Sequence, residues 1–144
     1  MEHNDTIELL KECDAGTKMG VNSIDAVLDH IHESEFSRIL NESKEAHQAI
    51  GSQIHKQLNE QDESGKEPNP MARGMSWMKT NFMLSANDSD HTAADLITDG
   101  CNMGVKTLNR YLNQYQAADD ESKKLCRQLI DLEENLAKDI RQYL

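Results

Sequence analysis

Two short motifs with glycine at positions i and i+4 constrain this sequence more than any other feature. Residues 16–21 read G-T-K-M-G-V and residues 100–105 read G-C-N-M-G-V, and each motif lies within a long segment with helical spacing of apolar residues. Glycine inside a helix costs about 0.5–1 kcal/mol relative to alanine, so placing it on a solvent-exposed face would be unfavourable. We therefore expect the two helices to approach each other closely, backbone against backbone, at four glycines: Gly16, Gly20, Gly100 and Gly104. The alternative is that the glycines mark a local kink or leave room for a ligand.

The similarity between the two halves of the chain extends beyond these motifs. An offset of 84 residues aligns Gly20 with Gly104 and continues along both apolar stripes, and an offset of 86 aligns Ile54 with Ile140 on the helices that follow. Any two amphipathic helices align on their apolar stripes, which is sufficient to explain the second alignment but not the repeated glycine motif. The sequence thus predicts an internal repeat of two helix pairs related by a pseudo-twofold axis.

Helical periodicity marks four long segments, at residues 5–30, 34–60, 89–116 and 121–143. Between the second and the third, D-E-S-G-K-E-P-N-P supplies turn and helix-breaking residues, and a short amphipathic segment follows it. This connection, residues 61–88, is far longer than the roughly 2–8 residues typical between antiparallel neighbours. We predict a crossover that contains a short helix and joins helix pair 5–60 to helix pair 89–144.

Composition supports a single all-α domain over residues 1–144. The chain is long enough to bury one core, aromatic residues make up 4%, and no stretch alternates β-branched with polar residues. The formal net charge of −11, with no cluster of Lys and Arg among aromatic residues, disfavours nucleic acid as a partner. Because the sequence has neither a basic, apolar leader nor a run of about 18 apolar residues, we expect a cytoplasmic protein without membrane association.

The three cysteines, Cys13, Cys101 and Cys126, are odd in number and have no C-x-x-C spacing. They predict neither a disulfide framework nor a zinc site. We expect them to be buried as small apolar side chains.

Three stretches carry a resemblance to a known fold family. These are D-A-G-T-K-M-G-V-N-S-I at 14–24, R-G-M-S-W-M-K at 73–79 and D-G-C-N-M-G-V-K-T-L-N-R-Y-L at 99–112. The chain resembles a bacterial branch of the ferritin-like proteins that is known only as a domain of unknown function. The resemblance implies a ferritin-like four-helix bundle with one long crossover and internal pseudo-twofold symmetry.

The metal site of many ferritin-like proteins can be tested for directly. A di-iron centre needs inward-facing carboxylates and a Glu-x-x-His on each of two helices. Asp14 and Asp99, the acids nearest the glycine stripes, lie more than about 110° from the glycine direction and should be solvated. No Glu-x-x-His occurs, and the closest remnants, both directed away from the apolar stripes, are Glu45-x-x-Gln48 and Asp131-x-x-Glu134. We expect no di-iron centre, no cofactor and no catalytic residues, although a metal on atypical ligands stays an alternative.

Two ionisable residues do fall near the apolar stripes. His47 and Glu133 occupy equivalent positions on the second and fourth helices and are expected to meet near the pseudo-twofold axis. They predict either a metal or proton site or, more simply, a hydrogen-bonded polar pair at the edge of the core, since a buried charge requires a partner.

A second class of function is signalling. The stretch H-Q-A-I-G-S, which begins at His47, is similar to the H-x-L-K-G surroundings of the phosphoacceptor in histidine-phosphotransfer bundles. However, Ile50 stands where the lysine of that pattern would steady a phosphoryl group, and Glu42 and Glu45 would repel it. This alternative therefore ranks below a non-catalytic bundle.

The non-catalytic hypothesis is a stress-associated bundle or a self-association or interaction module. The crossover is rich in adaptable apolar side chains: Met71, Met75, Trp77, Met78, Phe82 and Met83. These side chains either cap the bundle or form a surface for a second copy or a protein partner.

Overall fold

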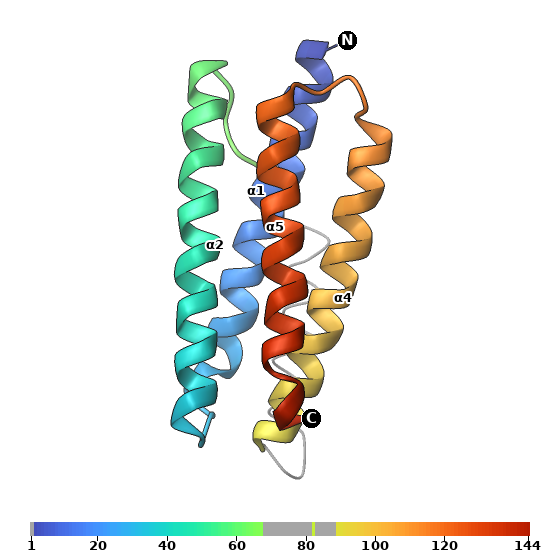
Figure 1. Cartoon of the computed structure of the whole chain (residues 1–144). Helices are drawn as coiled ribbons and strands as arrows, with labels where there is room; N and C mark the ends of the chain where they lie inside the picture. Colours follow the sequence, from blue (N-terminus) through green and yellow to red (C-terminus); the bar gives the residue numbers. More distant parts are fainter. Residues whose placement is uncertain (1, 68–81, 83–88) are drawn as a thin grey trace.

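The computed structural model describes residues 2–67, 82 and 89–144, and these residues form helices and turns without strands. The long helices are α1 (Glu2–Leu28), α2 (Ser34–Glu60), α4 (Asp90–Gln114) and α5 (Asp120–Asp139), followed by a 3-10 turn, η1 (Arg141–Tyr143). They lie alongside one another in a bundle (Figure 1). The predicted all-α class is confirmed.

Two of the predicted helix starts lie next to a capping residue. α4 begins after Ser89, whose hydroxyl accepts a hydrogen bond from the Thr92 amide at 3.2 Å. α5 begins after Asp119, whose carboxylate accepts from the Ser122 amide at 2.8 Å. α2 has the predicted bounds.

The C-terminal ends of α1 and α5 are followed by tight turns that periodicity does not reveal. α1 ends at Leu28 because the His30 amide donates to the Val27 carbonyl at 2.9 Å, a bond across only three residues. α5 ends at Asp139. Just beyond this end the Tyr143 amide donates to the Ile140 carbonyl at 3.0 Å, again across three residues. The predicted C-terminal boundaries at residues 30 and 143 were therefore too late, as was the one at 116, because α4 ends at Gln114. α1 also begins at Glu2, before the predicted residue 5.

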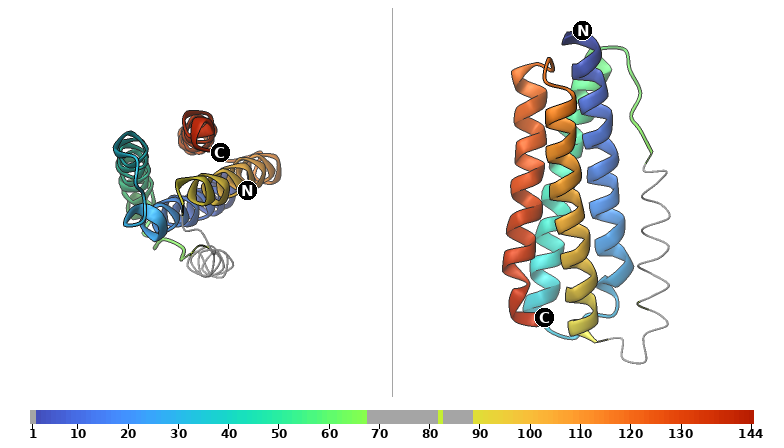
Figure 2. Two further views of the ribbon diagram at one scale, coloured as in Figure 1. Left: turned by 90° about the horizontal axis from the view of Figure 1, so that it is seen from below. Right: turned by 90° about the vertical axis from the view of Figure 1, so that its right-hand side faces the viewer.

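The directions of the helices define two antiparallel pairs, α1 with α2 and α4 with α5. α1 is antiparallel to α2 and α4 is antiparallel to α5, whereas α2 and α4 run in the same direction (Figure 1). The chain must therefore return from one end of the bundle to the other between α2 and α4. These two helices occupy opposite corners, and α1 and α5, which contact each other, lie between them (Figure 2).

Most of the connection lies outside the described residues, including the predicted short helix and the Met/Trp-rich surface. The exceptions are residues 61–67 and Phe82, which is fully buried and packs edge-on against the His30 ring, with 5.1 Å between ring centroids. The partner surface at residues 71–83 stays a prediction.

The core consists of two apolar clusters stacked along the bundle. One includes Ile24, Phe36 and Leu40 and lies toward the C-terminal end of α1. The other includes Leu9 and Ile54 and lies toward the N-terminal end of α1. All three cysteines are free and buried, as predicted. A group of polar residues and glycines separates the clusters, and the candidate site lies there.

Candidate functional site

The centre of the bundle holds a buried polar pair. His47 on α2 is fully buried, Glu133 on α5 is 8% exposed, and the His47 Nε2 to Glu133 Oε1 distance is 2.5 Å. The other ring nitrogen, Nδ1, lies 2.7 Å from the Ser43 carbonyl oxygen one helical turn earlier. Since a carbonyl only accepts, Nδ1 carries a proton, and an ionised Glu133 requires one on Nε2 as well.

This geometry favours the doubly protonated imidazolium. Burial by itself lowers the pKa of His47, but the hydrogen bond to Glu133, the negative charge of Glu133 and the Ser43 carbonyl outweigh it and raise the pKa above its ordinary value of 6.5. His47 and Glu133 therefore form a buried ion pair between the two halves of the chain. On the other side of Glu133, burial followed by the Glu133 charge raises the pKa of the Cys101 thiol, which stays protonated.

A raised His47 pKa makes the stability of the fold dependent on pH. The stabilisation is fully present below the unfolded-state pKa of 6.5 and is lost as pH rises through the higher folded-state pKa, by about 1.4 kcal/mol for each unit of difference. We expect the free energy of unfolding, measured by urea denaturation between pH 6 and 9, to fall with rising pH. The His47→Gln variant should show a flatter dependence; a slope equal to that of the wild type would contradict the assignment.

Two of the repeated glycines are located beside this pair. A Cβ atom built on Gly20 of α1 would lie 2.5 Å from His47 Nε2, closer than any real contact, whereas one on Gly104 of α4 would lie at an ordinary 3.5 Å from Glu133 Oε2. The atoms nearest both glycines are thus side chains of α2 and α5. Gly20 therefore leaves room for the His47 ring, and the expected backbone-to-backbone contact between the glycine helices stays a prediction.

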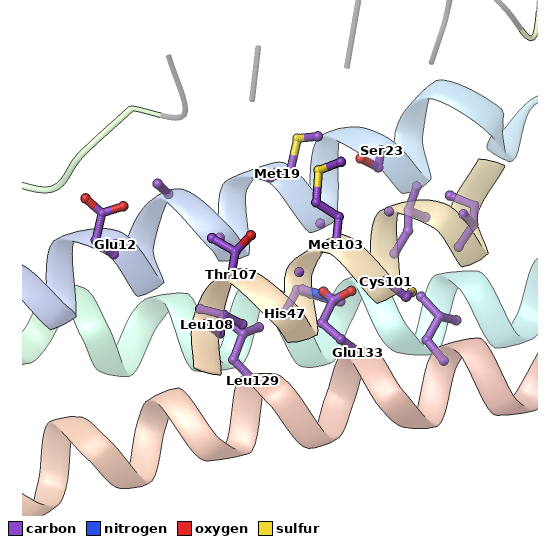
Figure 3. A pocket seen from close by; sticks show the side chains of 18 of the residues that line it. Glu12, Met19, Ser23, His47, Cys101, Met103, Thr107, Leu108, Leu129 and Glu133 are labelled. Atoms are coloured by element: carbon purple, nitrogen blue, oxygen red, sulfur yellow. The ribbon is translucent and has the colours of Figure 1, made fainter. Parts of the chain in front are cut away.

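The glycines also face a cavity. A cavity of ≈ 300 Å³ lies between the described residues of α1 and α4. The pair His47 and Glu133 lies at the inner side of this cavity, and all four predicted glycines are in its wall: Gly16, Gly20, Gly100 and Gly104. The remaining wall is mainly apolar and includes Ile24, Ile97, Leu108, Leu129 and Leu136. Met19 and Met103 extend from the two helices on the side away from α2 and α5 (Figure 3), and Met103 is 64% exposed.

One end of the cavity is lined by charged residues. Lys66, from the segment that follows α2, forms an ion pair with Glu12 of α1, and both residues line the cavity together with Glu67. Glu67 pairs with Lys18 at 2.9 Å. The cavity therefore has an apolar middle with paired charges at its inner wall and at one end.

A buried carboxylate fixes the segment that carries Lys66. Asp14 is fully buried and accepts hydrogen bonds from His55 Nε2 at 2.6 Å and the Lys66 amide at 2.9 Å, and its Oδ2 lies 2.9 Å from Lys18 Nζ. A Cβ atom on Gly65 would overlap Asp14 Oδ2, so only glycine permits this approach. The expectation that Asp14 is solvated was wrong: its side of α1 is covered by α2 and by residues 62–67. Asp99 is exposed, as expected.

The remaining candidate ligands stay apart. Within the described ranges, no three or more His, Cys, Asp or Glu residues come together in an arrangement that could hold a metal ion. The two Glu-x-x-His remnants lie on the surface, as predicted, because all of their end residues are exposed: Glu45, Gln48, Asp131 and Glu134. His47 has both ring nitrogens engaged and no exposed surface, which counts against a phosphoacceptor role.

Fold and site together define an all-helical bundle with a glycine-lined central cavity. Comparison with protein-family models, with curated proteins and with solved structures finds no match to this chain. Among the helices described, none has the length and apolar character needed to cross a bilayer.

Proposed function

We propose that this chain is a non-catalytic four-helix bundle protein that binds one small, mainly apolar molecule in the cavity between α1 and α4. The observation that carries the proposal is the cavity of ≈ 300 Å³ and its apolar wall. That volume is within the range of ligand sites, and it is about twice the roughly 150 Å³ of an engineered cavity that binds benzene. A bicyclic aromatic ring system or an aliphatic group of similar volume would fit.

The glycines support this proposal because they explain the space. Four glycines on α1 and α4 are in the wall of the same cavity. A Cβ atom on Gly16 would lie 3.2 Å from Leu129 and one on Gly20 would overlap His47, so a side chain at either position would displace residues that form this wall. Each glycine costs about 0.5–1 kcal/mol of helix stability. A cavity kept open at this cost is more simply explained by an occupant than by packing alone.

The charged groups support a binding role over catalysis. In the described part of the wall, His47 pairs with Glu133, Lys66 with Glu12 and Glu67 with Lys18. A general acid or base has to exchange a proton with a bound substrate, and His47 has both ring nitrogens engaged and no exposed surface. We therefore continue to propose that the protein is not an enzyme.

A ferritin-like arrangement with an internal repeat is part of the same proposal. It is supported by the shared direction of α2 and α4, and by the way Gly20 faces His47 as Gly104 faces Glu133. Superposing residues 5–60 on 89–144 tests the repeat, and it is overturned if Gly20 and Gly104 do not coincide.

Ligand binding is tested with N-phenyl-1-naphthylamine, a dye that fluoresces in apolar surroundings. We expect saturable enhancement with about one equivalent of the full chain. Gly100→Leu, which fills the cavity from α4, should abolish the enhancement without unfolding the protein, whereas Asn102→Leu, at an exposed position of the same helix, should leave it unchanged. An unsaturable signal, or one that Gly100→Leu does not alter, would refute the proposed function.

A further inference from the structure

We infer that the occupant of the cavity carries a hydrogen-bond donor, a hydroxyl or an amine, directed at Glu133; this inference rests on the proposed function. Glu133 lines the cavity although it is 8% exposed, and only its Oε1 is engaged by His47. Its other oxygen, Oε2, faces Gly104, where a Cβ atom would be 3.5 Å away. Glu133 lies below α4 and beside His47 in the view into the cavity (Figure 3).

The acceptor capacity of Glu133 exceeds the donors that surround it. An ionised carboxylate has about four lone-pair sites. The described donors to Glu133 are His47 Nε2 and the thiol of Cys101. The hydrogen bond from Cys101 to Glu133 is one cause of the raised pKa of the Cys101 thiol. A carboxylate removed from water is stabilised by each further donor, so a ligand that supplies one binds more tightly than an apolar ligand of the same shape.

The charges around the cavity disfavour an anionic ligand. Three carboxylates, from Glu12, Glu67 and Glu133, and two cations, from Lys66 and His47, line it, and the whole chain has a formal net charge of −11. A ligand carboxylate would bring a second acceptor and a like charge toward Glu133. The chemistry therefore selects a neutral or cationic donor and excludes a fatty acid or an organic phosphate.

Three probes with one ring system test this selection: naphthalene, 2-naphthol and 2-naphthoate, each used to displace N-phenyl-1-naphthylamine from the full chain at pH 7. A single hydrogen bond to a charged group predicts that 2-naphthol binds about tenfold more tightly than naphthalene. We expect 2-naphthoate to bind more weakly than both.

A matched pair of variants assigns the effect to Glu133. Glu133→Gln keeps the shape of the side chain but removes its charge, so the preference for 2-naphthol over naphthalene should fall below about threefold and 2-naphthoate should bind better than it does to the wild type. Glu134→Gln, at the exposed neighbouring position, should reproduce the wild type in all three affinities.

The outcomes separate this inference from the proposed function. Equal affinity of the wild type for naphthalene and 2-naphthol would overturn the donor assignment and leave the cavity as an apolar binding site. Tightest binding of 2-naphthoate would overturn it as well and point to an anion site. No saturable binding of the dye or of any probe would refute the proposed function itself. The affinities of the wild type for the three probes test the donor assignment even if Glu133→Gln does not fold.

Discussion

Glu133→Ala should lower the free energy of unfolding by about 3–5 kcal/mol, because it leaves the buried His47 without the carboxylate that pairs with it. His47→Ala should have a similar effect on Glu133. The double variant His47→Leu/Glu133→Leu should cost far less than the sum of the single changes, since replacing both partners with apolar groups removes the unpaired charge together with its partner. Urea denaturation at pH 6 measures all of these variants.

Glu134→Ala is the matched control for these variants. It removes a carboxylate from the adjacent, exposed position of α5 and should change stability by less than about 0.5 kcal/mol. If the effects of His47→Ala and Glu133→Ala were simply additive in the double alanine variant, the two residues would not be coupled and the buried ion pair would be wrong.

Gly20→Ala should destabilise the fold and Gly104→Ala should not, although the two glycines occupy corresponding positions in the repeated motif. At Gly20 the new methyl group would overlap the His47 ring, which is held at both nitrogens, so we expect a loss of about 1–3 kcal/mol. At Gly104 the methyl group would make ordinary contacts with Glu133, so the better helix propensity of alanine should leave stability unchanged or raise it by up to about 1 kcal/mol.

Chemical denaturation of the two variants, at one pH below 6.5, decides this prediction. Equal losses at both positions would favour the original explanation, in which the two helices touch symmetrically at their glycines. A tolerated Gly20→Ala would mean that His47 moves aside at little cost, and the space explanation for Gly20 would fail.

The sequence predicted those parts of the fold that depend on local chemistry. The bounds of α2 and the N-terminal cap of α4 at Ser89 follow from periodicity and from one hydroxyl group. The positions of His47 and Glu133 near the apolar stripes also follow from the helical period, and the structure locates both in the core. The C-terminal ends of α1 and α5 were misjudged because three-residue turns leave no mark on an apolar pattern.

The site was harder to predict because it depends on which elements cover each face of a helix. Asp14 lies off the glycine stripe, and only the return of residues 62–67 onto α1 makes it a buried acceptor. The glycines show where side chains are missing, but the pattern does not distinguish a neighbouring backbone, an imidazole ring or an open cavity. In this chain Gly20 meets the ring, and all four glycines line the cavity.

The ion pair also has a consequence for how the two halves recognise each other. The first helix pair supplies the cation, His47, and the second supplies the anion, Glu133. With the halves related as we propose, two copies of the first half would bring two imidazolium groups together, and two copies of the second would bring two carboxylates together. Like charges so close are costly inside a protein. The pair thus makes each half complementary to the other and not to itself, which discourages exchange of halves between neighbouring chains as symmetric self-pairs.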